Sequence, residues 1–176
     1  MMLLFSSCAA EQSNPIDSEA PSSVSGILSS FSTTDLDGNQ VDQSILEGHK
    51  LTMINVWATF CGPCLQEMPD LGELAKEYSD EGVQIIGLVT DVFEMDGSIS
   101  DDQVANAKDI VVQTRADYLH LLPSDDLDGI LNSVTAVPTT FFVDSEGRQV
   151  SSAYIGSMNK DTWREVIDAM LAEVEI

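Results

Sequence analysis

Two cysteines, Cys61 and Cys64, stand two residues apart where an apolar run gives way to a helical pattern. The run over residues 51–57 is short and apolar, which favours a strand buried on both faces. Apolar side chains then recur at three- and four-residue spacing, so a helix is expected to begin at or just after Cys61 and to end near Tyr78. The two sulfurs are therefore predicted to lie at a strand-helix junction, where they can break and re-form a disulfide.

The predicted helix gives the two sulfurs different roles. Backbone N–H groups and the positive end of the dipole at a helix N-terminus favour a thiolate, so Cys61 is expected to attack. Cys64, one turn inside, is expected to resolve the mixed disulfide that Cys61 forms with a substrate. Gly62 and Pro63 stiffen the turn between them. This chemistry needs no cofactor beyond the reversible Cys61–Cys64 disulfide.

A half zinc site or two unrelated core cysteines are the alternatives. A structural zinc ion needs four ligands, usually from a second CxxC or a histidine pair. The remaining cysteine, Cys8, lies far upstream, and His49 and His120 stand alone. We therefore expect no metal site, and we interpret His120, on an apolar strand, as a structural histidine.

Around the cysteines the chain resembles the thioredoxin superfamily, and within it the membrane-anchored thiol-disulfide oxidoreductases of the TlpA/ResA type. The resemblance covers about residues 27–174 and depends on three features. These are the motif Cys61-Gly62-Pro63-Cys64, Pro69, which matches the proline that kinks the active-site helix, and residues 137–144, which resemble the cis-proline strand. The resemblance implies an α/β, thioredoxin-like fold. Its central mixed sheet is flanked by helices, with an N-terminal β-hairpin extension and a helical insertion.

The resemblance also implies roles for residues near the cysteines. A cis Val137–Pro138 bond would turn the Val137 backbone toward the cysteines to pair with a substrate strand, and a trans proline opening an edge strand is the alternative. Trp57 matches a motif tryptophan and is expected in the core. Phe60 replaces the tryptophan that usually precedes the first cysteine. The side chain beside the cysteines stays apolar but lacks the indole N–H donor, so the range of substrates is expected to differ.

Asn55 stands where thioredoxin carries a buried aspartate that serves the inner cysteine. An amide cannot exchange a proton at neutral pH, so another base is needed. The resemblance to ResA-type proteins points to a carboxylate just after the next strand. That region offers Asp91 and Glu94, with Asp91 nearer, and a solvated loop carboxylate is the alternative for each.

The chain is expected to hold one folded domain behind two short segments. Residues 1–8 resemble a truncated or partial bacterial lipoprotein signal ending at the lipobox cysteine, Cys8, although Phe5 departs from the usual leucine and the apolar stretch is short. A free thiol on a disordered start is the alternative. Residues 9–26 are rich in serine and are expected to form a disordered tether. Residues 27–176 form the predicted thioredoxin-like domain.

Periodicity and turn residues predict the elements of that domain. The first elements are a hairpin with its turn at residues 37–39 and two strands, 51–57 and 83–89, joined by a helix. A helix over 104–114, a brief strand at 119–122 and a short helix to 131 follow. An antiparallel hairpin over 139–155 and a last helix over about 160–174 complete the domain.

Composition limits the partners. Seven Lys and Arg against thirty Asp and Glu give a formal net charge of −23, which opposes binding to nucleic acid. Beyond the start of the chain, no run approaches the roughly 20 apolar residues of a spanning helix. The resemblance and the lipobox-like start together imply an extracytoplasmic, lipid-anchored bacterial protein, expected to be a monomer, that reduces protein disulfides and is itself reduced by a membrane electron donor.

A copper-handling module and a thiol peroxidase are two other functions found on the same fold. A copper-handling module would use a wider CxxxC spacing with a histidine nearby, because thiolates and imidazole suit copper. A thiol peroxidase would depend on one peroxidatic cysteine in a threonine-rich turn. The CxxC spacing favours neither.

Overall fold

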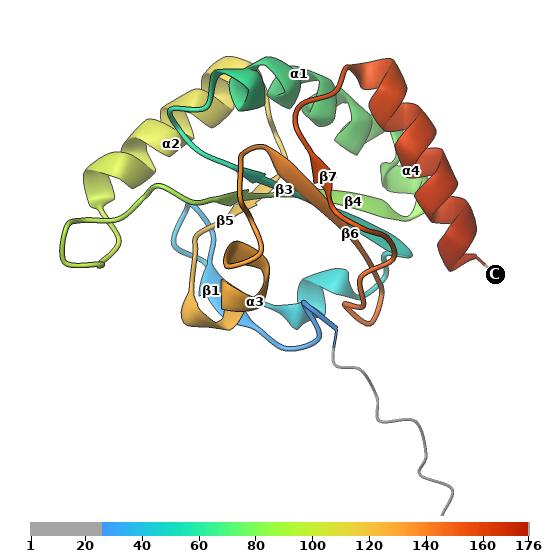
Figure 1. Cartoon of the computed structure of the whole chain (residues 1–176), viewed down its shortest axis with the longest axis horizontal. Helices are drawn as coiled ribbons and strands as arrows, with labels where there is room; N and C mark the ends of the chain where they lie inside the picture. The colour runs from blue at the N-terminus through green and yellow to red at the C-terminus, as the bar shows by residue number, and fades with distance from the viewer. Residues whose placement is uncertain (1–25, 176) are drawn as a thin grey trace, which may run out of the picture.

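A five-stranded mixed sheet with the order β5-β4-β3-β6-β7 forms the centre of the computed structural model, which describes residues 26–175 (Figure 1). The middle strand, β3, is parallel to β4 and antiparallel to β6, and β4 is parallel to β5. The CxxC motif follows shortly after β3, so the two cysteines lie beyond the carboxyl end of the central strand. The strands are β3 (Leu51–Trp57), β4 (Val83–Val89), β5 (Leu119–Leu121), β6 (Thr139–Asp144) and β7 (Tyr154–Ile155).

Three long helices, α1 (Gly62–Glu77), α2 (Asp101–Thr114) and α4 (Lys160–Val174), arch over one face of the sheet in Figure 1. On the opposite side lie the antiparallel pair β1 (Ser32–Thr34) and β2 (Gln40–Asp42), the short helix α3 (Asp128–Leu131) and a 3₁₀ turn at Gln43–Leu46. Further 3₁₀ turns lie at Ser79–Glu81 and Asp125–Leu127. The predicted thioredoxin-like fold, with its N-terminal hairpin, is confirmed.

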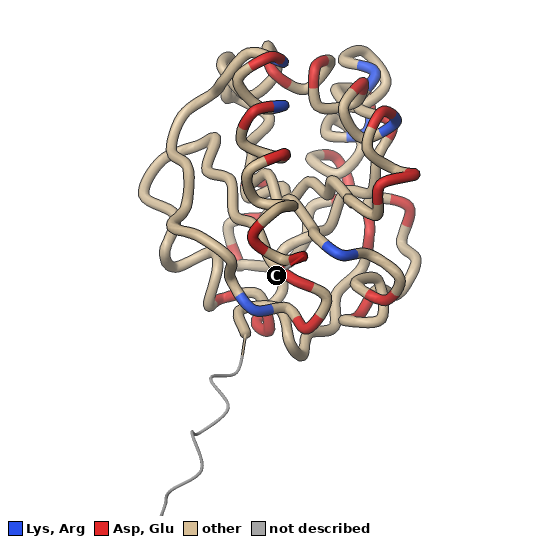
Figure 2. The backbone as a smooth tube through the Cα atoms, turned by 90° about the vertical axis from the view of Figure 1, so that its right-hand side faces the viewer, with Lys and Arg blue, Asp and Glu red and all other residues tan. Residues whose placement is uncertain are grey.

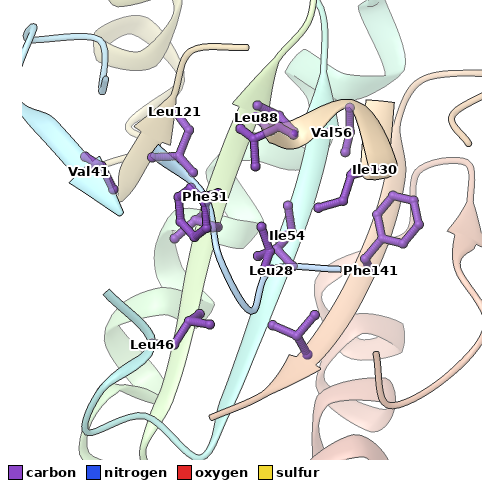
Figure 3. Packing of buried hydrophobic residues seen from close by; sticks show 13 residues of the cluster. Leu28, Phe31, Val41, Leu46, Ile54, Val56, Leu88, Leu121, Ile130 and Phe141 are labelled. Carbon is purple, nitrogen blue, oxygen red and sulfur yellow. The ribbon is translucent and has the colours of Figure 1, made fainter. Parts of the chain in front are cut away.

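The two faces of β3 belong to different cores, which explains its continuous apolar sequence. Ile54 and Val56 pack on the hairpin side, in the cluster that Figure 3 shows. Met53 and Trp57 face the helices instead. Every residue of β3 is buried. The strand that carries the motif is therefore held on both faces. The other labelled members of the Figure 3 cluster are Leu28, Phe31, Val41, Leu46, Leu88, Leu121, Ile130 and Phe141.

The hairpin predicted over residues 139–155 has a shorter return strand than expected. Only Tyr154–Ile155 and an isolated bridge between Val143 and Gln149 pair with β6. Between them, the Gln149 amide donates to the Ser151 carbonyl. Local side-chain bonds of this kind compete with a strand ladder, so the segment leaves the sheet before it returns.

The surface is acidic, as the view in Figure 2 shows by its many red and few blue segments. Six of the basic side chains, Lys50, Lys76, Lys108, Arg148, Lys160 and Arg164, form ion pairs with carboxylates. The remaining carboxylates leave a negative field around the domain. Among residues 26–175, no helix combines the length and apolar character that crossing a bilayer requires.

Candidate active site

Cys61 and Cys64 form a disulfide at the N-terminus of α1, with a sulfur–sulfur distance of 2.02 Å. Cys61 is the N-cap residue, and its Sγ accepts a hydrogen bond from the backbone N–H of Cys64 at 3.2 Å. Cys61 keeps 5% of its surface exposed, whereas Cys64 is fully buried. The outer sulfur is thus the one that a substrate can reach, and a backbone donor is already directed at it.

Asp91 holds the loop between β3 and the cysteines. Its carboxylate accepts hydrogen bonds from the Thr59 backbone N–H at 2.9 Å and from the Thr59 hydroxyl at 2.5 Å. Glu94 lies on an exposed loop beyond it. The sequence-based role of either residue as the base for Cys64 stays a prediction, and the bonds of Asp91 to Thr59 give it a structural role as well.

The Val137–Pro138 peptide bond is cis and comes immediately before β6. Val137 packs against the hydrophobic cluster that contains Cys61 and Cys64. Within residues 26–175 its backbone N–H and carbonyl have no hydrogen-bond partner. They are available to pair with the backbone of an extended polypeptide.

A groove of about 650 Å³ opens beside the motif. Phe60, next to Cys61, is 78% exposed at one side of it, and Phe93 is 45% exposed at another. Asp128 is the charged residue of its lining, and it has no ion-pair partner among the described residues. The groove can therefore receive apolar side chains next to the disulfide. The rest of its lining is Thr90, Pro123, Leu131, Val134, Thr135, Ala136 and Val137.

Residues 16–171 match the family described as Redoxin. The chain belongs to the Redoxin family. It is 33% identical over 133 residues to the thiol-disulfide oxidoreductase ResA of Bacillus cereus, covering 74% of this chain and 69% of that protein. It is 33% identical over 143 residues to the thiol:disulfide interchange protein DsbE of Vibrio cholerae, covering 78% and 69%.

Solved structures agree with this assignment. A thioredoxin-family thiol:disulfide interchange protein from Chlorobium tepidum superposes with a TM-score of 0.66 at 25% identity, covering 81% of this chain and 93% of that one. MTB DsbF, at 24% identity, shares the fold with a TM-score of 0.64, covering 82% and 96%. Together with the Cys61–Cys64 disulfide, these matches identify the Redoxin-family chain as a thiol-disulfide oxidoreductase.

A buried carboxylate that the sequence analysis missed, Glu67, lies one turn beyond Cys64 on α1. It is 2% exposed and accepts hydrogen bonds from the Asn55 amide at 2.9 Å, the Trp163 indole N–H at 3.2 Å and the Met158 backbone N–H at 3.1 Å. Burial raises the pKa of Glu67 above its ordinary value, against the opposing effect of these donors. A charged residue on the apolar stripe of the predicted helix was the signal that could have revealed it.

Trp57 lies fully buried under the helices, as expected, with His120 beside it. The His120 ring meets the indole edge-on at a centroid distance of 5.6 Å and stacks on Tyr118 at 4.4 Å. Burial lowers the pKa of His120 to about 4, so the imidazole is neutral at pH 7. Within residues 26–175, no group of three His, Cys, Asp or Glu side chains is arranged to hold a metal ion.

Protonation of His120 is expected to weaken the fold in acid. Its folded-state pKa, about 4, lies below the ordinary 6.5, so this stabilisation is complete above pH 6.5 and is lost as the pH falls toward 4. The loss amounts to about 3 kcal/mol in the free energy of unfolding. Urea unfolding of the wild type and His120→Gln between pH 4 and 7 measures it. Equal slopes against pH in the two proteins would contradict the assignment.

Proposed function

We propose that this Redoxin-family protein is a reductase of protein disulfides outside the cytoplasm. The observation that carries the proposal is the asymmetry of the two cysteines: Cys61 caps α1 and keeps 5% of its surface exposed, and Cys64 is fully buried behind it. The reduced form is inferred to hold Cys61 as the thiolate. Helix N-termini stabilise such an anion by backbone N–H groups and by the dipole.

The proposed reaction moves two electrons in two exchanges. The Cys61 thiolate attacks one sulfur of the substrate disulfide, which forms a mixed disulfide and releases the other substrate sulfur as a thiolate. Cys64 then loses its proton and attacks Cys61 Sγ. The Cys61–Cys64 bond forms, the mixed disulfide breaks, and the second substrate thiolate leaves. The substrate has been reduced and the protein oxidised.

Substrate binding in this proposal uses the unpaired backbone of Val137 and the groove beside it. An extended segment that pairs with Val137 can place the side chain next to its cysteine between Phe60 and Phe93. The Asp128 carboxylate and the negative field of the domain favour a substrate with a basic residue near that cysteine.

Glu67 is proposed as the proton acceptor for Cys64, a role that the sequence analysis gave to Asp91 or Glu94. Residues three apart on a helix are neighbours, so the two buried side chains lie within about 5–6 Å of each other at Cβ. A carboxyl group whose pKa is raised by burial is closer to neutrality and suits proton exchange near the working pH. The step needs a base because Asn55 cannot exchange a proton.

The location outside the cytoplasm is proposed with a lipid on Cys8, which lies outside the described residues. Gly26, the first described residue, lies against Gly147, since a Cβ on Gly26 would come within 2.2 Å of the Gly147 carbonyl oxygen. Gly147 follows β6, whose Asp144 pairs with Leu51 at the start of β3. The N-terminal segment therefore joins the domain at the end of β3 opposite the cysteines. In this proposal a lipid on Cys8, joined there through the predicted tether, keeps the domain at the membrane and leaves the disulfide free to meet substrates and a membrane electron donor, with the protein a monomer.

The reduction potential of Cys61–Cys64 tests the direction of electron flow. A reductase is expected near thioredoxin, at about −270 mV, because both use a Cys-Gly-Pro-Cys motif. Equilibration with reduced and oxidised dithiothreitol, read by alkylation and mass spectrometry, gives the value. A potential near the roughly −120 mV of DsbA would overturn the reductase and favour an oxidant.

A further inference from the structure

A polar row crosses the buried, helix-facing side of the sheet. The strand registers pair Asn55 of β3 with Thr140 of β6 on one side and with Gly87 of β4 on the other. Gly87 in turn pairs with His120 of β5. Asn55 and Thr140 are fully buried and His120 is 3% exposed. Polar groups in such a place normally all have partners, so the ones that lack them need an explanation.

The hydrogen bonds of Glu67 restrict where it can hold a proton. Its Oε2 accepts from two fixed donors, the Met158 backbone N–H and the Trp163 indole N–H. Among residues 26–175, its Oε1 accepts only from the Asn55 amide nitrogen, which also donates to the Thr140 hydroxyl at 3.1 Å. A proton on Glu67 must therefore sit on Oε1, where it would meet the amide N–H of Asn55 head-on.

Within the part of the chain that the structure describes, two acceptors on the far side of Asn55 have no donor. They are the amide oxygen of Asn55 and Nδ1 of His120, and both are buried. The other ring nitrogen of His120 lies 3.1 Å from the Ala116 carbonyl, so it carries the proton and Nδ1 is the acceptor. A Cβ on Gly87 would lie 2.1 Å from Nδ1. Nδ1 therefore occupies the space over Gly87, on the strand that pairs with Asn55. The Trp57 indole nitrogen, which is buried without a partner among residues 26–175, lies 3.0 Å from the same Cβ position.

We propose that Asn55 is a positioning residue whose amide turns by half a rotation when Glu67 gains or loses its proton. In the orientation observed, the amide nitrogen serves the carboxylate. After rotation, the amide oxygen accepts the O–H of protonated Glu67, and the amide nitrogen turns toward Nδ1 of His120. Thr140 serves both states, because a hydroxyl can accept or donate. The inference depends on the proposed role of Glu67 as proton acceptor for Cys64.

The other charged and titratable groups around Glu67 do not offer its proton a better site than Asn55. The like charge of Asp70 on α1 disfavours the Glu67 carboxylate. Tyr118, from the segment before β5, interacts electrostatically with Glu67, and its hydroxyl is buried with no partner among the described residues. The Lys160 ammonium, on α4, is engaged by Glu73 and Glu77. With Cys61 and Cys64 joined, Glu67 titrates without a nearby thiol, so the oxidised protein isolates the event.

NMR of the oxidised protein tests the rotation directly. The side-chain amide signals of Asn55 are expected to change with pH at the same midpoint as the carboxyl carbon of Glu67. Glu67→Gln places an NH₂ where the O–H would be, so it is expected to fix the rotated orientation at every pH and to reproduce the acid spectrum of the wild type. Asn55 signals that stay constant while Glu67 titrates would overturn the proposal.

A second variant distinguishes rotation of the Asn55 amide from a fixed amide by the direction in which it shifts the pKa of Glu67. His120→Phe makes the surroundings less polar, which alone would raise the pKa of Glu67. If the amide rotates, the pKa of Glu67 should instead fall by about one unit. The reason is that the state with protonated Glu67 loses the hydrogen bond from the Asn55 amide to Nδ1 of His120. Thr140→Val is the matched control and is expected to shift the midpoint little, since both states lose the same partner. A rise with His120→Phe would refute the rotation, while disulfide reduction by the wild type would leave the proposed function standing.

Discussion

Replacing Cys64 with serine is expected to convert the protein into a trap for its substrates. Cys61 keeps its place at the N-cap of α1, so it can still attack a disulfide, but no second thiol can release the product. Mixed disulfides through Cys61 should accumulate, and turnover should fall by several orders of magnitude. Non-reducing gels of cell extracts, followed by mass spectrometry of the adducts, measure the trapping and name the partners.

The matched control for the trap is Cys61→Ser, which leaves the buried sulfur alone. Cys64 is fully enclosed, so this variant should form few adducts. Equal trapping by the two variants would show that the assigned roles of the sulfurs are wrong.

Replacing Glu67 with glutamine is expected to slow the release of the mixed disulfide by about 100-fold at neutral pH, the lower range for loss of a general base. The first attack by Cys61 should change little, because Glu67 is buried behind the motif. Rapid mixing of reduced protein with a peptide disulfide separates the two phases. The slow phase should also lose its dependence on pH near the pKa of Glu67.

Asp91→Asn and Glu94→Gln are the controls for this experiment, and they test the two carboxylates to which the sequence pointed. Both are expected to release the mixed disulfide at nearly the wild-type rate. If Asp91→Asn slows the second phase and Glu67→Gln does not, the proton passes through Asp91.

Much of the fold could be predicted from the sequence because local and tertiary preferences agree. Residues 51–57 read as a doubly buried strand, and β3 is buried at every position. The last helix was expected over about 160–174 and spans Lys160–Val174, with Trp163 and Ile167 buried. The return strand of the last hairpin was overestimated, because side-chain bonds around Gln149 are invisible in an apolar pattern.

Site residues that belong to a sequence motif could be predicted. Site residues that the fold brings together from distant parts of the chain could not. Cys61 and Cys64 follow from their spacing, and the cis Val137–Pro138 bond was expected from resemblance. Glu67 was missed because its partners Asn55 and Trp163 are 12 and 96 residues away in the chain. His120 was interpreted as a structural histidine, and it lies buried on β5. The sequence did not predict that its Nδ1 would lack a partner among residues 26–175, because that depends on the pairing of β5 with β4 at Gly87.

Electrons are proposed to leave the protein through the Cys61–Cys64 pair, and a stoichiometric reaction with a disulfide substrate measures this transfer. Fully reduced protein is mixed with excess insulin, quenched by alkylation and mapped by mass spectrometry. We predict that one insulin disulfide is opened for each protein molecule oxidised, and that the oxidised molecules contain the Cys61–Cys64 bond. Opened insulin disulfides alongside alkylated Cys61 and Cys64 would show that the electrons come from another group.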